Sequence, residues 1–112
     1  MDCVFCKIVQ GAIPAEKAYE DNKVLVFSDL NPQAPVHLLA IPKVHIKNAA
    51  QIDEQNADMI AHLFAVIAQL AVTMGLDDGF RVVTNCGKDG GQTVDHLHFH
   101  LLAGRTLGWP PG

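Results

Sequence analysis

The chain has 112 residues, of which 49% are hydrophobic, and its formal net charge is −4. This length predicts one domain over residues 1–112 with a single hydrophobic core, and the composition excludes a disordered chain. The negative charge argues against nonspecific binding to nucleic acid, which needs a basic surface, but it allows a local pocket for a small phosphorylated ligand.

The first half of the chain predicts a short helix followed by three strands. Residues 4–9 form an apolar stretch of one or two helical turns that ends before Gly11. β-branched and aromatic residues then predict strands at residues 18–20, 23–28 and 37–41. A polar turn separates the first two strands, and the proline-containing loop at 30–35 precedes the third.

The second half predicts one long helix and two more strands. Apolar residues recur every three and four positions over residues 54–74, with Asp53 as the expected N-cap and Gly75 as the expected C′ residue. A strand is expected at residues 80–85, and a glycine-rich loop at 86–92 leads into a last strand that begins at His96.

This order of elements predicts an α+β fold with an antiparallel sheet of about five strands, one long helix and a short N-terminal helix. No apolar run reaches the roughly 20 residues of a membrane span. The first residues lack the basic and apolar regions of a signal peptide, so we expect a cytoplasmic protein without membrane partners. Three cysteines are an odd number, which favours free thiols or a metal site over a disulfide framework.

Three histidines, His96, His98 and His100, alternate with apolar residues in the last strand. Side chains on a strand change face at every residue, so Leu97 and Phe99 should enter the core while the histidines share the other face. Such a row of imidazoles suits nucleophilic catalysis, and it equally suits a catalytic metal held by three histidines. Spacing alone leaves both possibilities open.

The loop before this strand offers donors for an anion. Its glycines leave backbone N–H groups accessible, and Asn85, Gln92 and Thr93 add amide and hydroxyl groups. Backbone nests of this kind bind phosphate oxygens. Next to the histidines, such a loop favours phosphoryl chemistry, because charge on the phosphate needs donors beside the nucleophile.

The sequence resembles the histidine triad family, and within it the Hint-like branch, from end to end. The segments that carry the resemblance are His96-Leu97-His98-Phe99-His100-Leu101-Leu102, Asp29-Leu30-Asn31-Pro32-Gln33-Ala34-Pro35-Val36-His37, Ile41-Pro42-Lys43, Asp89-Gly90-Gly91-Gln92 and Trp109-Pro110-Pro111-Gly112. The resemblance implies hydrolysis of purine nucleoside 5′-phosphoramidates, of the adenosine 5′-monophosphoramidate type, to a nucleoside monophosphate and an amine.

In this family the middle histidine, here His98, attacks the α-phosphorus and forms a covalent nucleotidyl-histidine. His100 faces the phosphate, and His37 belongs to the same hydrogen-bonded cluster. Asn85 and Thr93 match positions that contact the phosphate or the leaving group.

The resemblance also implies a nucleoside site. Asp29 matches the carboxylate that holds the ribose hydroxyls, and the apolar walls around the base match Phe5, Ile8, Phe27 and Leu30. Two positions depart from the branch. Thr93 replaces a frequent serine and keeps the hydroxyl, whereas Asp95 replaces a frequent tyrosine with a carboxylate.

Cys3 and Cys6 are two residues apart, and such a pair can bind one zinc ion together with two histidines. Family members with this cysteine pair resemble the present chain, and they imply His45 and His96 as the remaining ligands. The implied zinc is structural, because it ties the N-terminus to the histidine strand, and catalysis needs no cofactor.

Other functions remain open at this stage: a dinucleoside polyphosphate hydrolase, a nucleotidyltransferase, a nucleotide-binding regulatory module with incidental hydrolysis, or a metallohydrolase with three histidines. The presence of His100 and Trp109 disfavours the first two. The resemblance further implies a homodimer with a helix and a strand at the twofold axis and the C-terminal tail near the partner's site.

Overall fold

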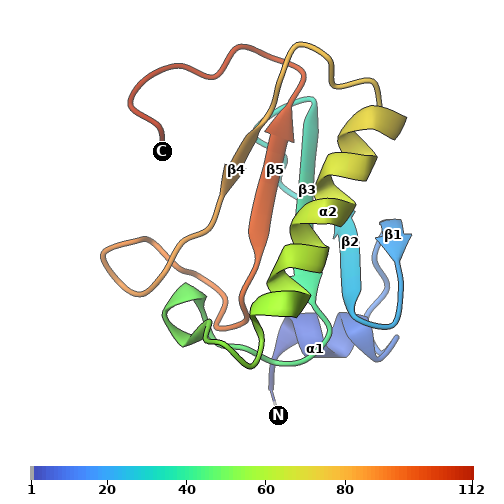
Figure 1. The fold of residues 1–112 in the computed structure, drawn as a ribbon, viewed down its shortest axis with the longest axis vertical. Coiled ribbons are helices and arrows are strands. Elements are labelled where there is room, and N and C mark those ends of the chain that lie inside the picture. Colours follow the sequence, from blue (N-terminus) through green and yellow to red (C-terminus); the bar gives the residue numbers. More distant parts are fainter. Residues whose placement is uncertain (1) are drawn as a thin grey trace.

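The computed structural model describes residues 2–112, and Figure 1 shows their fold. The elements are α1 (Val4–Val9), β1 (Lys17–Glu20), β2 (Val24–Ser28), β3 (Val36–Pro42), the 3₁₀ turn η1 (Ala49–Gln51), α2 (Ala57–Thr73), β4 (Arg81–Val83) and β5 (Phe99–Ala103). The strands pair antiparallel in one five-stranded sheet. The predicted α+β fold with one long and one short helix is therefore confirmed.

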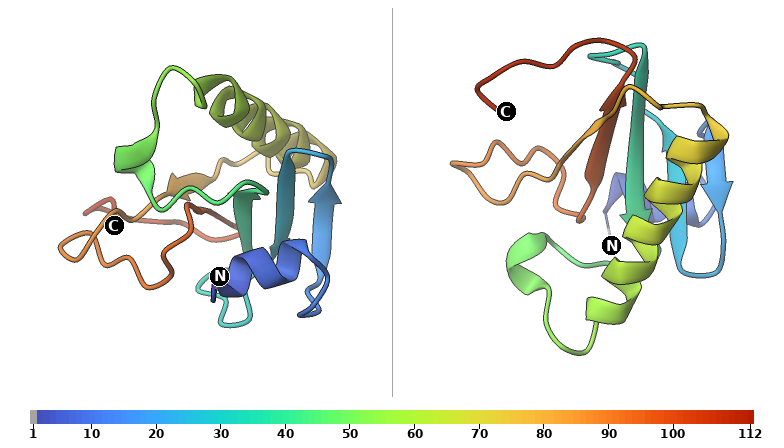
Figure 2. Two further views of the ribbon diagram at one scale, coloured as in Figure 1. Left: turned by 90° about the horizontal axis from the view of Figure 1, so that it is seen from below. Right: turned by 45° about the horizontal axis from the view of Figure 1, so that its top comes forward.

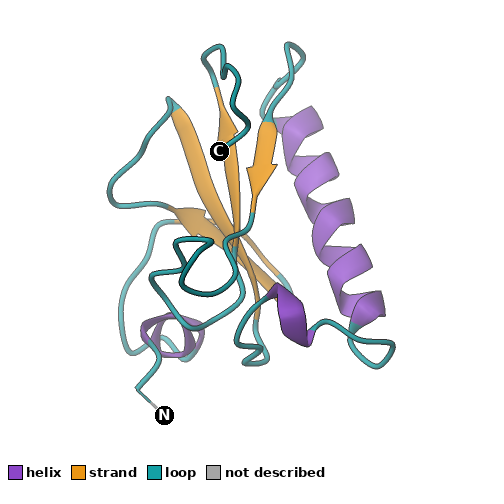
Figure 3. Ribbon diagram, turned by 90° about the vertical axis from the view of Figure 1, so that its left-hand side faces the viewer, coloured by secondary structure: helices purple, strands orange, loops and turns teal. Residues whose placement is uncertain are grey.

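The strand order is β1-β2-β3-β5-β4, so β5 lies between β3 and β4. The strand that carries the end of the histidine motif is thus an inner strand, held by ladders on both sides. The two helices lie on opposite faces of the sheet (Figure 2), and Figure 3 shows the same layers from the side.

Each face of the sheet has its own core, so the single core predicted from the length is replaced by two, one on either side of the sheet. Val24 and Val26 of β2 contribute to the core under α2, while Leu25 and Phe27 contribute to the core under α1. Burial on both faces explains why β2 is a continuous apolar run rather than an alternating one. Leu97, Phe99 and Leu101 enter the core under α2, as expected. The histidines between them therefore belong to the face covered by α1.

The long helix packs one apolar face on the sheet through Leu63, Val66, Ile67, Leu70 and Ala71. It is also tied to the β1–β2 turn, where the Nε2 atom of His62 lies 2.6 Å from Oδ2 of Asp21. None of the helices in residues 2–112 is long and apolar enough to cross a membrane.

The helix begins later than predicted. Residues 54–56 form a separate turn, in which Oδ1 of Asp53 accepts hydrogen bonds from the backbone N–H groups of Gln55 and Asn56. The N-cap position of α2 is Asn56, so Asp53 as the N-cap was wrong. The C-terminal prediction agrees with the structure, because α2 is followed by Gly75 at φ 69°, a conformation that favours glycine.

The last two strands are shorter than predicted, since β4 covers only Arg81–Val83 and β5 begins at Phe99. The backbone N–H of Leu97 donates to the carbonyl of Ile46 over 2.6 Å, and the hydroxyl of Thr84 donates to the carbonyl of His98 over 2.8 Å. These bonds replace the regular ladder before β5. His96 and His98 therefore lie on an irregular segment that still alternates between the two faces.

Candidate functional site

His98 lies almost fully buried at the α1 face, with one ring nitrogen fixed by the backbone. Its Nδ1–H donates a 2.7 Å hydrogen bond to the carbonyl of His96. Because a carbonyl only accepts, the proton of the neutral ring is on Nδ1 and the lone pair is on Nε2. The arrangement presents an unprotonated nitrogen, which is the form a nucleophile needs.

A second hydrogen-bonded chain lies beside His98. The backbone N–H of Gln33 donates to Nδ1 of His37 over 3.0 Å, which places the proton of His37 on Nε2. That Nε2 lies 2.8 Å from Nδ1 of His100 and 3.3 Å from Oδ2 of Asp29. His100 thus accepts at Nδ1 and keeps its own proton on Nε2.

Burial lowers the pKa of His100, and the positive charges that His98 and His37 carry when protonated lower it further, against the opposing effect of Asp29. His100 is therefore neutral near pH 7. A neutral ring with Nε2–H can donate one hydrogen bond to a phosphate oxygen without adding a charge next to His98.

A pocket of about 300 Å³ opens onto this cluster. It combines an apolar lining with a few polar groups, as ligand sites usually do. The predicted site residues that line it are Phe5, Ile8, Phe27, Asp29, Leu30, Thr93, His98 and His100. Leu30 is 99% exposed although it is apolar, so a bound ring system would remove its side chain from water.

Two residues predicted to contact nucleotide do not line this pocket, namely Asn85 and Gln92. The side chain of Gln92 is already used within the loop, where it accepts from the backbone N–H of Gly87 and donates to the carbonyls of Lys47 and Val94. Gln92 therefore shapes the loop that carries Thr93. His37 also lies outside the pocket lining, and it contacts His100 through the Nδ1 atom of that ring.

Sequence reasoning missed part of the lining. Ile13, Pro14 and Leu39 also line the pocket. Leu39 has a recognisable signal, because it lies two residues after His37 on β3 and therefore shares its face. The backbone donor of Gln33 has no such signal, since a backbone N–H leaves no trace in the side-chain pattern.

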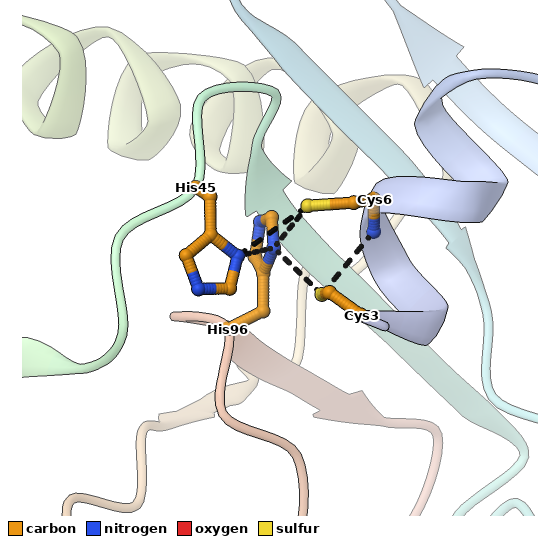
Figure 4. Close-up of side chains that lie close together, drawn as sticks. All are labelled: Cys3, Cys6, His45 and His96. Carbon is orange, nitrogen blue, oxygen red and sulfur yellow. Dashed lines mark hydrogen bonds between the residues drawn. The ribbon is translucent and has the colours of Figure 1, made fainter. Parts of the chain in front are cut away.

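The four predicted metal ligands converge at the N-terminus of α1 (Figure 4). Nδ1 of His96 lies 3.3 Å from Sγ of Cys3, 3.6 Å from Sγ of Cys6 and 3.2 Å from Nδ1 of His45. Sγ of Cys6 lies 3.3 Å from Nδ1 of His45. Nε2–H of His96 donates to the carbonyl of Pro42 over 2.8 Å, so Nδ1 carries the lone pair and faces the other three ligand atoms.

This geometry fits a tetrahedral cation. Zinc bonds to sulfur and nitrogen place neighbouring ligand atoms about 3.3–3.8 Å apart, close to the separations found here. Burial lowers the pKa of His96, which keeps it neutral as a ligand. Burial and the adjacent Cys3 raise the pKa of Cys6, so a bound cation is needed to favour its thiolate. Cys86 is exposed and lies outside the cluster.

The three triad histidines do not form one metal site together. His96 turns Nδ1 toward the cysteines, whereas His98 uses Nδ1 to donate to a carbonyl. The sequence left two roles open for the three histidines, a nucleophile or a set of metal ligands. In the structure the three residues are divided between two places. His96 belongs to the Cys/His cluster, and His98 and His100 belong to the pocket.

Comparisons with known proteins agree over nearly the whole chain. A family model described as "Scavenger mRNA decapping enzyme C-term binding" matches residues 2–107. A 14 kDa zinc-binding protein from Zea mays is 47% identical over 111 residues, which cover 97% of this chain and 87% of that protein.

Two solved structures share the fold closely. A histidine triad protein from Clostridium difficile is 51% identical, with a TM-score of 0.92 over 96% of this chain and 95% of that chain. A HIT family hydrolase from Legionella pneumophila is 46% identical, with a TM-score of 0.96 over 99% of this chain and 100% of that chain. With its His96-His98-His100 signature placed at the pocket and the Cys/His cluster, the chain belongs to the histidine triad family.

Proposed function

We propose that this protein is a Hint-like nucleotide-binding hydrolase that cleaves purine nucleoside 5′-phosphoramidates, using His98 as the nucleophile. One observation carries the proposal: the 2.7 Å hydrogen bond from Nδ1–H of His98 to the carbonyl of His96 leaves Nε2 free beside the pocket. The HIT family hydrolase from Legionella pneumophila, with its TM-score of 0.96, supports a hydrolase.

The reaction has two displacement steps. Nε2 of His98 attacks the α-phosphorus, a P–N bond to the ring forms, and the P–N bond to the amine breaks. The departing amine takes a proton that the hydroxyl of Thr93 relays from solvent, while Nε2–H of His100 donates to a phosphate oxygen. Water then attacks phosphorus and gives a proton back to solvent, the bond to His98 breaks with the electron pair returning to Nε2, and the nucleoside monophosphate is released.

The remaining lining residues suit the nucleoside. Asp29 offers a carboxylate to the ribose hydroxyls, and its contact with His37 holds that carboxylate in place. Phe5 and Phe27 meet edge to face with ring centroids 5.5 Å apart, and with Ile8 and Leu30 they offer apolar surface to a purine. One domain, residues 1–112, supplies all these groups.

We propose zinc as the cation of the Cys/His cluster. The Zea mays protein named as zinc-binding supports this choice, as do the two sulfur and two nitrogen atoms. When bound, the ion supplies a structural cross-link between α1 and the segment that carries the triad. Free thiols and this metal set suit a cytoplasmic location, where cysteines stay reduced.

A panel of substrates tests the hydrolase. Adenosine, guanosine and uridine phosphoramidates should be hydrolysed, with the purine compounds preferred, and diadenosine polyphosphate should react much more slowly. A reversed order of rates would favour a dinucleoside polyphosphate hydrolase. Tight nucleotide binding without turnover of any substrate would favour a regulatory module. Activity that survives a chelator under conditions where the protein stays folded would exclude a catalytic metal.

We also propose a homodimer. Four large apolar side chains remain exposed: Phe64, which packs edge to face on Phe99 but is still 43% exposed, Val72 of α2, Phe80 before β4, and Trp109 in the C-terminal tail. Strand β4 is at the edge of the sheet, and an exposed edge is suited to an interface. Light scattering at micromolar concentration should give the mass of two chains, and the mass of one chain would overturn the dimer.

A further inference from the structure

The Cys/His cluster and the nucleotide pocket are built from the same two segments. In α1, Cys6 belongs to the cluster while the adjacent Phe5 lines the pocket. In the segment before β5, His96 belongs to the cluster and His98 lines the pocket. A movement of α1 or of the segment before β5 would therefore displace residues of both the cluster and the pocket.

Phe5 makes the connection through side-chain contacts. Its ring centroid lies 5.9 Å from that of His96 and 5.2 Å from that of His98, both edge to face. It also meets Phe27, which lines the same pocket, edge to face. Phe5 is therefore a buried aromatic side chain in contact with a cluster ligand, the attacking histidine and the pocket wall together.

His96 makes the connection through its backbone. Its ring is held between the cluster at Nδ1 and the carbonyl of Pro42 at Nε2. Its own carbonyl accepts the hydrogen bond that sets the proton of His98 on Nδ1. A shift of the His96 backbone, once its ring is no longer held by the cluster, would therefore move the carbonyl that fixes the proton of His98 on Nδ1.

We propose that cation binding at the Cys/His cluster and nucleotide binding in the pocket are thermodynamically coupled, with Phe5 and His96 as the positioning residues that carry the coupling. This inference rests on the proposed function insofar as the pocket binds a nucleoside monophosphate. Loss of the cation releases α1, and the pocket loses the support of one wall. By linkage, AMP must strengthen cation binding by the same factor by which the cation strengthens AMP binding.

Affinities measured in both directions test the coupling. The dissociation constant of AMP should rise about tenfold when zinc is removed, within the usual range for coupled sites. Competition with a zinc chelator should show zinc held about tenfold more tightly when AMP is saturating. The Cys6→Ser variant should bind AMP as weakly as zinc-free protein, whereas Cys86→Ser, which alters an exposed thiol outside the cluster, should match the wild type.

A measurement with the cation in place covers the case in which zinc-free protein unfolds. Co²⁺ in a site of two thiolates and two imidazoles absorbs visible light, and its spectrum reports ligand geometry. Saturating AMP should shift this band in the wild type and shift it much less in Phe5→Leu, which keeps all four ligands.

The coupling would be overturned if folded protein bound AMP equally well with and without zinc. It would also be overturned if the Co²⁺ band stayed unchanged when calorimetry shows that AMP is saturating. Phosphoramidate hydrolysis by the same preparation distinguishes failure of this inference from failure of the proposed function. Normal turnover with no coupling removes this inference alone, whereas no AMP binding and no turnover remove the proposed function as well.

Discussion

Replacing His98 with alanine is expected to reduce hydrolysis of adenosine 5′-phosphoramidate by roughly 10⁴-fold or more, the scale seen when a covalent nucleophile is removed. His98 has the only ring in the pocket whose Nδ1–H donates to a carbonyl among residues 2–112, and this bond leaves Nε2 free. Neighbouring groups can polarise the phosphate, but without this nitrogen no covalent bond to phosphorus forms. Steady-state kinetics and a single-turnover assay measure the loss.

The intermediate itself gives a second readout. Wild-type protein quenched during turnover should carry a nucleotidyl group on His98, detectable by mass spectrometry and labile in acid, because a P–N bond to imidazole hydrolyses in acid. His98→Ala should carry none. In His98→Gly the emptied space allows added imidazole to replace the missing ring, so partial recovery of turnover is expected.

His62→Ala serves as the matched control. It removes a histidine whose side chain is 39% exposed on α2 and pairs with Asp21, away from the pocket lining. Turnover in this variant should stay near the wild-type rate. Circular dichroism should show native structure in both variants. Full turnover by folded His98→Ala would refute the nucleophile assignment.

The predictions that agree with the structure are those that rest on the periodicity or spacing of residues. The alternation of Leu97, Phe99 and Leu101 with histidines predicted which residues share a face. In the structure these three apolar residues lie in the core under α2, while His98 and His100 line the pocket with residues of the other face. Alternation depends only on local backbone geometry, which a short sequence specifies. The cysteine spacing likewise pointed to two thiols that do converge with the rings of His45 and His96.

The features that the sequence did not predict depend on hydrogen bonds that leave no mark in the residue pattern. The start of β5 is set by a hydrogen bond from Leu97 to Ile46 and another from Thr84 to His98, and neither appears in the local pattern. Gln92 carries donors suited to phosphate, yet Lys47 and Val94 already use them. A polar side chain in a loop does not reveal whether its partner is a ligand or the protein itself.

Removing zinc is expected to have the second large effect, on stability rather than on chemistry. A ligand that binds only the folded state adds about 4 kcal/mol at a free concentration 1,000 times its dissociation constant. For a chain of this size each kcal/mol moves the melting temperature by about 4 °C, so chelation should lower it by about 15 °C. Calorimetry of loaded and chelated protein measures the difference.

The physical reason is local. The cluster joins the N-cap of α1, where Sγ of Cys3 accepts from the backbone N–H of Cys6, to the fully buried ring of His96. Without a cation, only weak hydrogen bonds between a thiol and an imidazole, Cys3 with His96 and Cys6 with His45, join these four groups. Cys3→Ser should therefore reproduce most of the loss, because serine is a poor zinc ligand, while Cys86→Ser should melt like the wild type.

Thiol reactivity makes the same test at the level of single residues. With zinc bound, a thiol reagent should modify only Cys86, the exposed cysteine of the three. After chelation, Cys6 and then Cys3 should become reactive as α1 loosens, and elemental analysis should show one zinc per chain lost in the process. Unchanged melting and unchanged labelling after complete zinc removal would leave α1 held by its apolar contacts alone, and the ion would then have no structural role at this face of the sheet.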